Sequence, residues 1–254
     1  MIFREFGNKN KLTIVLLHGG GLSWWMWKSQ IEVLSKDYYV ITPIIDGHGE
    51  DFNTDFISIE DSSLKLIDFI KKELNGKIHA IAGLSIGAQI VVEVLSRESE
   101  IAEYAIIESA LVYPIKTITA FSVPMLYLFY GLIKRKWYAR LQAKTLNIPD
   151  ILFDNYFNDS SMISKRSLIN ITNSNGNYSI PKNIENSNSK TLFFVGEKEL
   201  SIMKKSAKSL SEILKHSTLK MIPNYSHGEL SILNPDKYLE LLVNHLNQIK
   251  SQQK

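Results

Sequence analysis

Short, mostly apolar runs recur along the chain, and longer segments with a helical period of apolar residues separate most of them. Runs of this length and composition are typical of strands buried on both faces of a sheet. Strands that alternate with helices predict an α/β fold, with a mostly parallel central sheet and helices on both of its faces. The predicted strands are Leu12–Leu17, Tyr38–Pro43, Ile78–Ala82, Tyr104–Ile107, Thr191–Val195 and Thr218–Ile222.

The alternation stops between residues 113 and 189, where helical patterns continue without a convincing strand. This stretch opens with an aromatic-rich run, continues with the basic cluster 134–136, and ends in an Asn- and Ser-rich tract over 170–189 that predicts a solvated loop. We predict one α/β core domain, residues 1–112 and 190–254, interrupted by a helical lid at 113–189.

Composition places the 254-residue chain among globular proteins, with 44% hydrophobic and 22% charged residues. It contains no cysteine, which excludes disulfides, thiolate metal sites and a cysteine nucleophile. The net charge of +3 is too small to indicate a nucleic-acid partner. The predicted lid carries nine basic and four acidic side chains, whereas acidic residues slightly outnumber basic ones elsewhere.

No segment has the pattern of a membrane span or a signal peptide. The run Ala120–Ile133 is shorter than the ~20 apolar residues that cross a bilayer, and it contains Pro124 and Gly131. Charged residues near the first methionine do not fit the apolar stretch of a leader sequence. We therefore expect a soluble, cytoplasmic protein without stable membrane insertion.

The sequence Gly83-Leu-Ser85-Ile-Gly87 lies between a predicted strand and a predicted helix. This is the context of a nucleophile elbow, a sharp turn that presents a serine hydroxyl above the sheet. Small residues on either side of the serine prevent the strand and helix from clashing. The motif predicts that Ser85 is a nucleophile; a serine that only caps the helix is the alternative.

A glycine-rich turn, His18-Gly-Gly-Gly21, follows the strand at 12–17. Glycines leave backbone N–H groups open toward a cavity, where they can stabilise the oxyanion formed when a serine attacks a carbonyl group. We predict an oxyanion hole from the N–H groups of Gly20 and Ile86, with Gly21 as the alternative to Gly20. His18 is interpreted as a structural residue of the turn.

Together these motifs resemble the α/β-hydrolase superfamily. The resemblance rests on His18-Gly-Gly, Asp46-Gly-His-Gly49, Gly83-Leu-Ser-Ile-Gly87, Gly196-Glu-Lys-Glu199 and Ser226-His227-Gly228, which occur in the family's order and leave only the predicted lid unmatched. Members of the family order their catalytic residues as nucleophile, acid and histidine.

The resemblance implies that His227 is the catalytic base, because it lies late in the chain and precedes a glycine. Glu199 aligns with the family's acid, at a position where aspartate is more common, so the acid assignment also leaves Glu108 and Glu197 open. The remaining histidines are interpreted as packing or surface residues: His48, His79, His216 and His245.

The implied reaction is two-step acyl transfer, in which Ser85 forms an acyl-enzyme that water then hydrolyses. It requires neither a metal nor an organic cofactor. We expect a carboxylic ester, or alternatively a thioester, of small or medium size as the substrate. Two other functions remain open on this scaffold: carbon–carbon bond hydrolysis or a lyase of the menaquinone-pathway type, and a non-catalytic ligand receptor.

Substrate-binding residues are predicted in two places. Trp24 and Trp25 follow the glycine-rich turn and are candidates for the mouth of the site. Phe121 and Leu128, in the aromatic-rich run of the predicted lid, are candidates for an apolar acyl-binding wall. The oligomeric state is not predicted.

Overall fold

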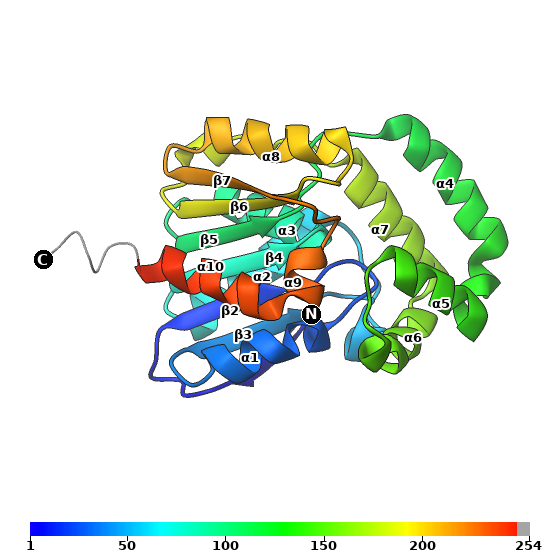
Figure 1. The fold of residues 1–254 in the computed structure, drawn as a ribbon, viewed down its shortest axis with the longest axis horizontal. Helices are drawn as coiled ribbons and strands as arrows, with labels where there is room; N and C mark the ends of the chain where they lie inside the picture. Colours follow the sequence, from blue (N-terminus) through cyan, green and yellow to red (C-terminus); the bar gives the residue numbers. More distant parts are fainter. Residues whose placement is uncertain (248–254) are drawn as a thin grey trace, which may run out of the picture.

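A seven-stranded sheet forms the centre of the protein in the computed structural model, which describes residues 1–247 (Figure 1). The strands lie in the order β1-β3-β2-β4-β5-β6-β7, and all neighbouring pairs are parallel except β1 with β3. The predicted mostly parallel sheet is thus confirmed. The strand bounds are β1 Ile2–Phe6, β2 Thr13–Leu17, β3 Tyr39–Ile44, β4 Ile78–Leu84, β5 Ala102–Glu108, β6 Lys190–Gly196 and β7 Ser217–Ile222.

The first strand, β1, is the one that the apolar pattern did not predict. Its residues pair antiparallel with β3 at the edge of the sheet, in a register that joins Ile2 to Ile44. An edge strand has one solvated side, so charged residues such as Arg4 and Glu5 are tolerated and no continuous apolar run marks it.

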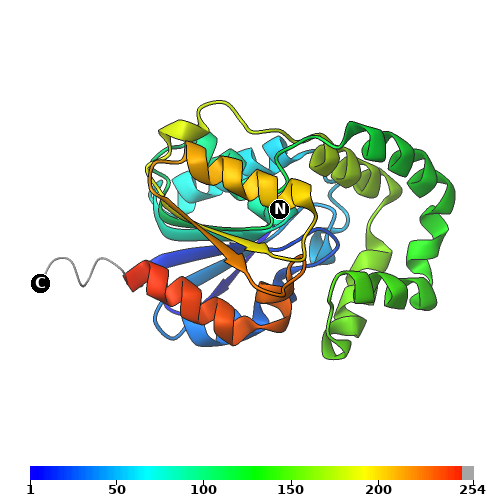
Figure 2. The ribbon, with the colours of Figure 1, turned by 45° about the horizontal axis from the view of Figure 1, so that its top comes forward.

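Helices cover both faces of the sheet, as predicted. One face packs α2 (Ile59–Glu73), α3 (Ile86–Arg97) and α8 (Ser201–Ile213) against the strands. The other face packs α1 (Lys28–Leu34) and α10 (Pro235–Asn247), with α9 (Glu229–Leu233) between β7 and α10. Figure 2 shows α8 and α10 on opposite sides of the strands. Buried Ile, Leu and Val side chains therefore fill two apolar layers.

Residues 178–189 return along α3 toward the start of β6, whereas residues 113–177 form helices grouped beyond one end of the sheet (Figures 1 and 2). They are α4 (Lys116–Phe129), α5 (Lys136–Thr145), α6 (Phe153–Met162) and α7 (Lys165–Asn177). Short 3-10 helices lie in this group at Tyr130–Lys134 and Asp150–Leu152, against α3 at Ile184–Asn186, and elsewhere at Trp24–Trp27 and Gly49–Asp51.

The Asn- and Ser-rich tract is only partly a loop, which corrects the prediction for 170–189. Its first eight residues continue α7, which begins at an N-cap where Ser164 accepts a hydrogen bond from the Ser167 N–H. Tertiary contacts hold this helical half: Asn170 donates to the Phe56 carbonyl, and Ser174 accepts from the Ile59 N–H. Packing thus overrides the weak helix propensity of asparagine and serine.

The apolar segment in this group is longer than the sequence pattern indicated. Helix α4 continues directly into the 3-10 helix Tyr130–Lys134, so Lys116–Lys134 forms 19 helical residues. By length and composition alone, this segment is sufficient to cross a membrane. The apolar run Ala120–Ile133 lacks the first turn of α4, which begins with the charged Lys116.

Candidate active site

Ser85 lies in a sharp turn between β4 and α3, with φ of 80° and ψ of −108°. A positive φ is rare for a residue with a side chain, and this one is imposed by the surrounding packing. A Cβ atom on Gly83 would lie 2.5 Å from the Gly87 backbone, and one on Gly87 would lie 2.5 Å from the His18 carbonyl oxygen. The two glycines therefore allow the close strand–helix contact that fixes the serine.

Ser85, His227 and Glu199 form a continuous hydrogen-bonded chain. Ser85 Oγ lies 3.0 Å from His227 Nε2, and His227 Nδ1 lies 2.9 Å from Glu199 Oε2. A carboxylate only accepts hydrogen bonds, so Nδ1 carries the proton and Nε2 is left to accept from the serine hydroxyl. The three residues come from separate connections: the turn after β4, the loop after β6, and the loop between β7 and α9.

Glu199 is held as an ionised carboxylate by its partners. Burial opposes ionisation, but the hydrogen bond and charge of His227 outweigh it, together with the Gly196 N–H and the Ser109 hydroxyl, so the pKa of Glu199 is lowered. Ser109 Oγ donates to Oε1 over 2.7 Å, and the Gly196 N–H donates to the same oxygen over 2.8 Å. Sequence reasoning missed Ser109, although it directly follows the strand that ends in Glu108.

The two alternative acids do not contact His227. Glu197 is exposed and accepts a hydrogen bond from the Asn224 N–H. Glu108 is buried at the end of β5 and accepts only a 3.3 Å hydrogen bond from the Ser231 N–H, while its Oε2 has no partner among the described residues. Burial raises the pKa of Glu108 to about 7 against the Ser231 hydrogen bonds, and the negative charge of Glu199 adds to the rise.

The other histidines lie in structural positions. His18 is fully buried, accepts from the Ile45 N–H at Nε2 and contacts the Gly19 carbonyl through Nδ1. His48 is buried against the Asp46 carbonyl, and His245 is buried with Nε2 3.0 Å from the Lys190 carbonyl oxygen. His79 pairs with Glu103, and His216 is exposed.

A cavity of about 340 Å³ opens at Ser85. Gly20, Gly21 and Ile86 line it together with Ser85 and His227. Ile86 is the first residue of α3, so its N–H has no acceptor within the helix. The remaining walls come from the 3-10 helix at 130–134, from α5, α6 and α7, and from the segments next to them: Ile133, Gln142, Leu146, Tyr156, Ser160, Ile163, Leu168, Ile171 and Asn175.

None of the four predicted substrate-binding residues lines this cavity. Trp24 packs on Phe6 and under the Arg4 guanidinium, and Trp25 is buried with its indole N–H donating to Asp159 over 2.6 Å. Phe121 lines a separate groove along α4, and Leu128 is exposed. The two tryptophans lie outside the cavity wall because they contact residues that are distant in the sequence, and local patterns do not reveal such contacts.

Asn147, which follows α5, ties the helices of 113–189 to the His227 loop. Its side-chain amide donates to Ser226 Oγ over 3.0 Å and to the His227 carbonyl over 3.2 Å. Glu229 completes the loop by accepting from the Ser226 N–H and hydroxyl. Nothing in the local sequence marked Asn147, because its partners lie about 80 residues away.

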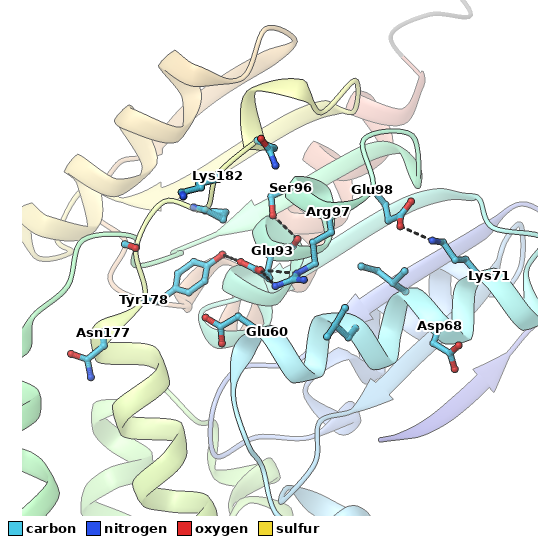
Figure 3. A pocket seen from close by; sticks show the side chains of 15 residues that line it. Glu60, Asp68, Lys71, Glu93, Ser96, Arg97, Glu98, Asn177, Tyr178 and Lys182 are labelled. Atoms are coloured by element: carbon cyan, nitrogen blue, oxygen red, sulfur yellow. Dashed lines mark hydrogen bonds and ion pairs between the residues drawn. The ribbon is translucent and has the colours of Figure 1, made fainter.

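A larger hollow of about 840 Å³ lies elsewhere, between α2, α3 and the chain after α7 (Figure 3). Its central charged groups are already paired: Glu93 accepts from Tyr178 over 2.9 Å and from Arg97 over 2.8 Å. Lys71 pairs with Glu98 at its margin. None of its lining residues contacts Ser85 or His227, so this hollow is separate from the candidate site. Within residues 1–247, no cluster of three or more His, Asp or Glu side chains has the arrangement of a metal site.

Comparison with known proteins identifies the family. The model of the alpha/beta hydrolase family matches residues 14–168, more than half of the chain. The chain therefore belongs to the alpha/beta hydrolase family. An AB hydrolase superfamily protein of Gibberella zeae is 26% identical over 141 residues, which are 55% of this chain and 49% of that protein. The chain thus matches about half the length of that relative.

Solved structures of the same fold cover nearly the whole chain. A carboxylesterase from Nitrososphaera gargenis superposes with a TM-score of 0.80 at 18% identity, covering 99% of this chain and 95% of its own. An esterase from Exiguobacterium antarcticum gives 0.79 at 16% identity, covering 96% and 94%. MenH from S. aureus gives 0.76 at 16% identity, covering 97% and 96%. At these identities the likeness establishes the fold and leaves the reaction to the site itself.

The raised pKa of Glu108 predicts a pH-dependent stability. The folded protein keeps a proton that the unfolded chain releases above the ordinary value of 4.5, so this contribution is full below 4.5 and is lost as the pH rises through about 7. Glu108→Gln keeps an acceptor for Ser231 but carries no charge. It should raise the free energy of unfolding at pH 8 by up to ~3 kcal/mol and change it little at pH 4, measured by urea unfolding.

The matched control is Glu197→Gln, which changes an exposed carboxylate near the same site. Its free energy of unfolding should equal that of the wild type at pH 4 and again at pH 8. A Glu108→Gln effect that is the same at pH 4 and pH 8, or of opposite sign, would contradict the expected protonation of Glu108.

Proposed function

We propose that the protein is a serine hydrolase that cleaves a carboxylic ester of small or medium size through an acyl-enzyme on Ser85. The observation that carries this proposal is the unbroken Ser85–His227–Glu199 chain, with the serine in a strained turn at the floor of a cavity. Family membership supports a hydrolase, and the esterases among the structural neighbours share the fold.

In the proposed mechanism, His227 Nε2 accepts the Ser85 proton as the serine attacks the ester carbonyl. The ionised Glu199 holds the imidazole through Nδ1 and stabilises its positive charge. The N–H groups of Gly20 and Ile86 receive the oxyanion, with Gly21 as the alternative donor. His227 then protonates the leaving alcohol, and water activated by the same imidazole hydrolyses the acyl-enzyme.

The cavity wall favours a neutral ester over the two alternatives. No residue that lines the cavity is Lys, Arg, Asp or Glu, and its one histidine is His227. A lyase or carbon–carbon hydrolase acting on an anionic substrate is expected to place an arginine or lysine at the pocket. A receptor that merely binds a ligand has no use for a strained serine hydrogen-bonded to a histidine.

We also propose that residues 113–189 act as a lid over the core at 1–112 and 190–254. In support, α5, α6, α7 and the segments next to them supply most of the walls above Ser85. Residues Lys134, Arg135 and Lys136 are exposed and lie outside the cavity wall, so they do not contact the proposed substrate there.

Replacement of the nucleophile tests the central assignment. Ser85→Ala should lower kcat for p-nitrophenyl esters by about 10⁴-fold or more, because the acyl-enzyme has no oxygen on which to form. Labelling by a fluorophosphonate should disappear as well. The matched control is Ser29→Ala, an exposed serine on α1, which should keep both activities. Wild-type-level turnover in Ser85→Ala, or a wild type inactive on every ester tested, would refute the proposal.

Replacement of the carboxyls tests the acid. Glu199→Gln keeps the size of the side chain but removes the charge that holds Nδ1 protonated, and should lower kcat by about 10²- to 10⁴-fold. Glu197→Gln should leave kcat near the wild-type value, because Glu197 contacts Asn224 and not His227. Equal losses in the two variants, or a loss only in Glu108→Gln, would transfer the role to another carboxyl.

Replacement of Ile133 tests whether this side chain limits the length of the acyl chain that the cavity accepts. Ile133 lines both the 340 Å³ cavity and the groove of about 720 Å³ along α4. Ile133→Ala should join the two spaces and raise the ratio of kcat/KM for dodecanoate over butyrate esters by about tenfold, the value of burying two methylene groups. The control Ile163→Ala, in the cavity wall but not the groove, should leave that ratio nearly unchanged.

A further inference from the structure

Helix α4 exposes an apolar stripe that no other part of residues 1–247 covers. Its members lie three and four residues apart on one side of the helix, and Phe121 and Leu128 are 74% and 72% exposed. Only 11% of the most apolar window of Lys116–Lys134 is buried. Soluble proteins rarely leave a contiguous stripe of this kind open. Its residues are Ile118, Phe121, Met125, Leu128 and Phe129.

The opposite side of α4 is packed. Thr119 is buried against α7, where a Cβ atom on Gly176 would lie 2.1 Å from Thr119 Oγ1. The Ile115 N–H, just before α4, donates to the Gly176 carbonyl over 2.8 Å. The helix is therefore fixed to the fold through one face and presents the other outward. Figures 1 and 2 show it at the edge of the molecule farthest from α10.

Positive charge lies at both ends of this stripe. Between residues 109 and 149 there are six basic side chains and no acidic one. Lys116 begins α4, Lys134 ends its helical extension, and Arg135 and Lys136 follow directly. Among these six cations, Lys136 alone has an ion pair within the described residues, with Asp154. The exposed Trp137 adjoins Tyr138, which lines the groove beside α4.

We propose that α4 and the basic residues at its two ends form a docking surface for an anionic lipid bilayer. The helix lies in the plane of the interface, with its apolar stripe among the acyl chains and its cations at the headgroups. It does not cross the bilayer, because Thr119 stays packed on α7 and both ends of the segment connect into the fold. Each cation contributes through attraction to phosphatidylglycerol or similar headgroups.

The charge pattern selects a lipid surface over a second copy of this chain. A symmetric dimer through α4 would place the same stripe, with the same cations at its ends, against itself, and acidic partners for those cations are absent from 109–149. An anionic bilayer supplies both missing components, an apolar layer and negative charge. Docking would bring the groove that shares Ile133 with the cavity against the lipid.

The test is sedimentation of the Ser85→Ala protein with vesicles, so binding is read without turnover. The protein should bind vesicles of phosphatidylcholine with phosphatidylglycerol, and more weakly vesicles of phosphatidylcholine alone; high salt should release it. Phe121→Ser with Leu128→Ser should weaken binding by about tenfold or more. Lys134→Gln with Arg135→Gln and Lys136→Gln should weaken it by about 100-fold, at roughly 1 kcal/mol for each charge.

Each set of substitutions has a matched control on another surface. Leu12→Ser with Leu200→Ser removes two leucines that are 60% and 74% exposed, and Lys205→Gln with Lys208→Gln and Lys215→Gln removes the same charge. Both controls should bind vesicles like the parent. The proposal is overturned if the parent does not bind anionic vesicles, or if the controls weaken binding as much as the α4 variants. It is also overturned if light scattering shows a dimer that the α4 variants dissociate and no lipid binding accompanies it.

Discussion

The close contact of Gly83 with Gly87 fixes the turn that presents Ser85 in the candidate active site. The end of β4 and the start of α3 approach so closely that a methyl group on Gly83 would overlap the Gly87 backbone, and one on Gly87 would overlap the backbone of Leu17 and His18 at the end of β2. The serine between them is thereby forced to a positive φ and displayed at the edge of the sheet. Because the strands are parallel, the turns after β2, β4 and β6 meet at that same edge. The glycine turn and the acid loop thus reach Ser85 without any special connection.

The site also depends on a difference between two neighbouring carboxyl groups. Glu199 accepts from His227, Ser109 and Gly196, and it remains charged despite burial. Glu108, on the adjacent strand, has one weak donor and an unpartnered oxygen, and burial favours its neutral form. Two negative charges in this space would repel each other, so the neutrality of one carboxyl makes the charge of the other tolerable.

Local patterns were sufficient to predict most of the fold. Apolar runs mark β2 to β6, whose residues are mostly buried on both faces of the sheet, and also β7, an edge strand whose residues are partly buried or exposed. The other edge strand, β1, carries no such run. Motifs that contain glycine also marked Ser85, Glu199 and His227 as candidates in the sequence, and the structure places them in hydrogen-bond contact. Their roles in a reaction stay a prediction.

Contacts between distant segments could not be predicted in this way. Trp25 donates a hydrogen bond to Asp159, and Asn147 donates one to the histidine loop. Both partners lie far away in the sequence, so neither position has a local signature. The same reason explains why the residues that line the cavity at Ser85 could not be predicted from the sequence. Aromatic residues near a glycine turn are natural candidates for a pocket, but the walls come instead from Gln142, Tyr156 and Ile171, whose positions depend on how α5, α6 and α7 pack.

The tether at Asn147 has a consequence for motion. Its amide joins the end of α5 to Ser226 and to the backbone of His227 itself. An outward swing of α5 that widened the cavity would have to break both hydrogen bonds or drag the histidine away from Ser85. In the proposed mechanism, opening of the cavity for product release and displacement of His227 are therefore mechanically linked, and proton transfer from Ser85 requires the helices above it to be closed.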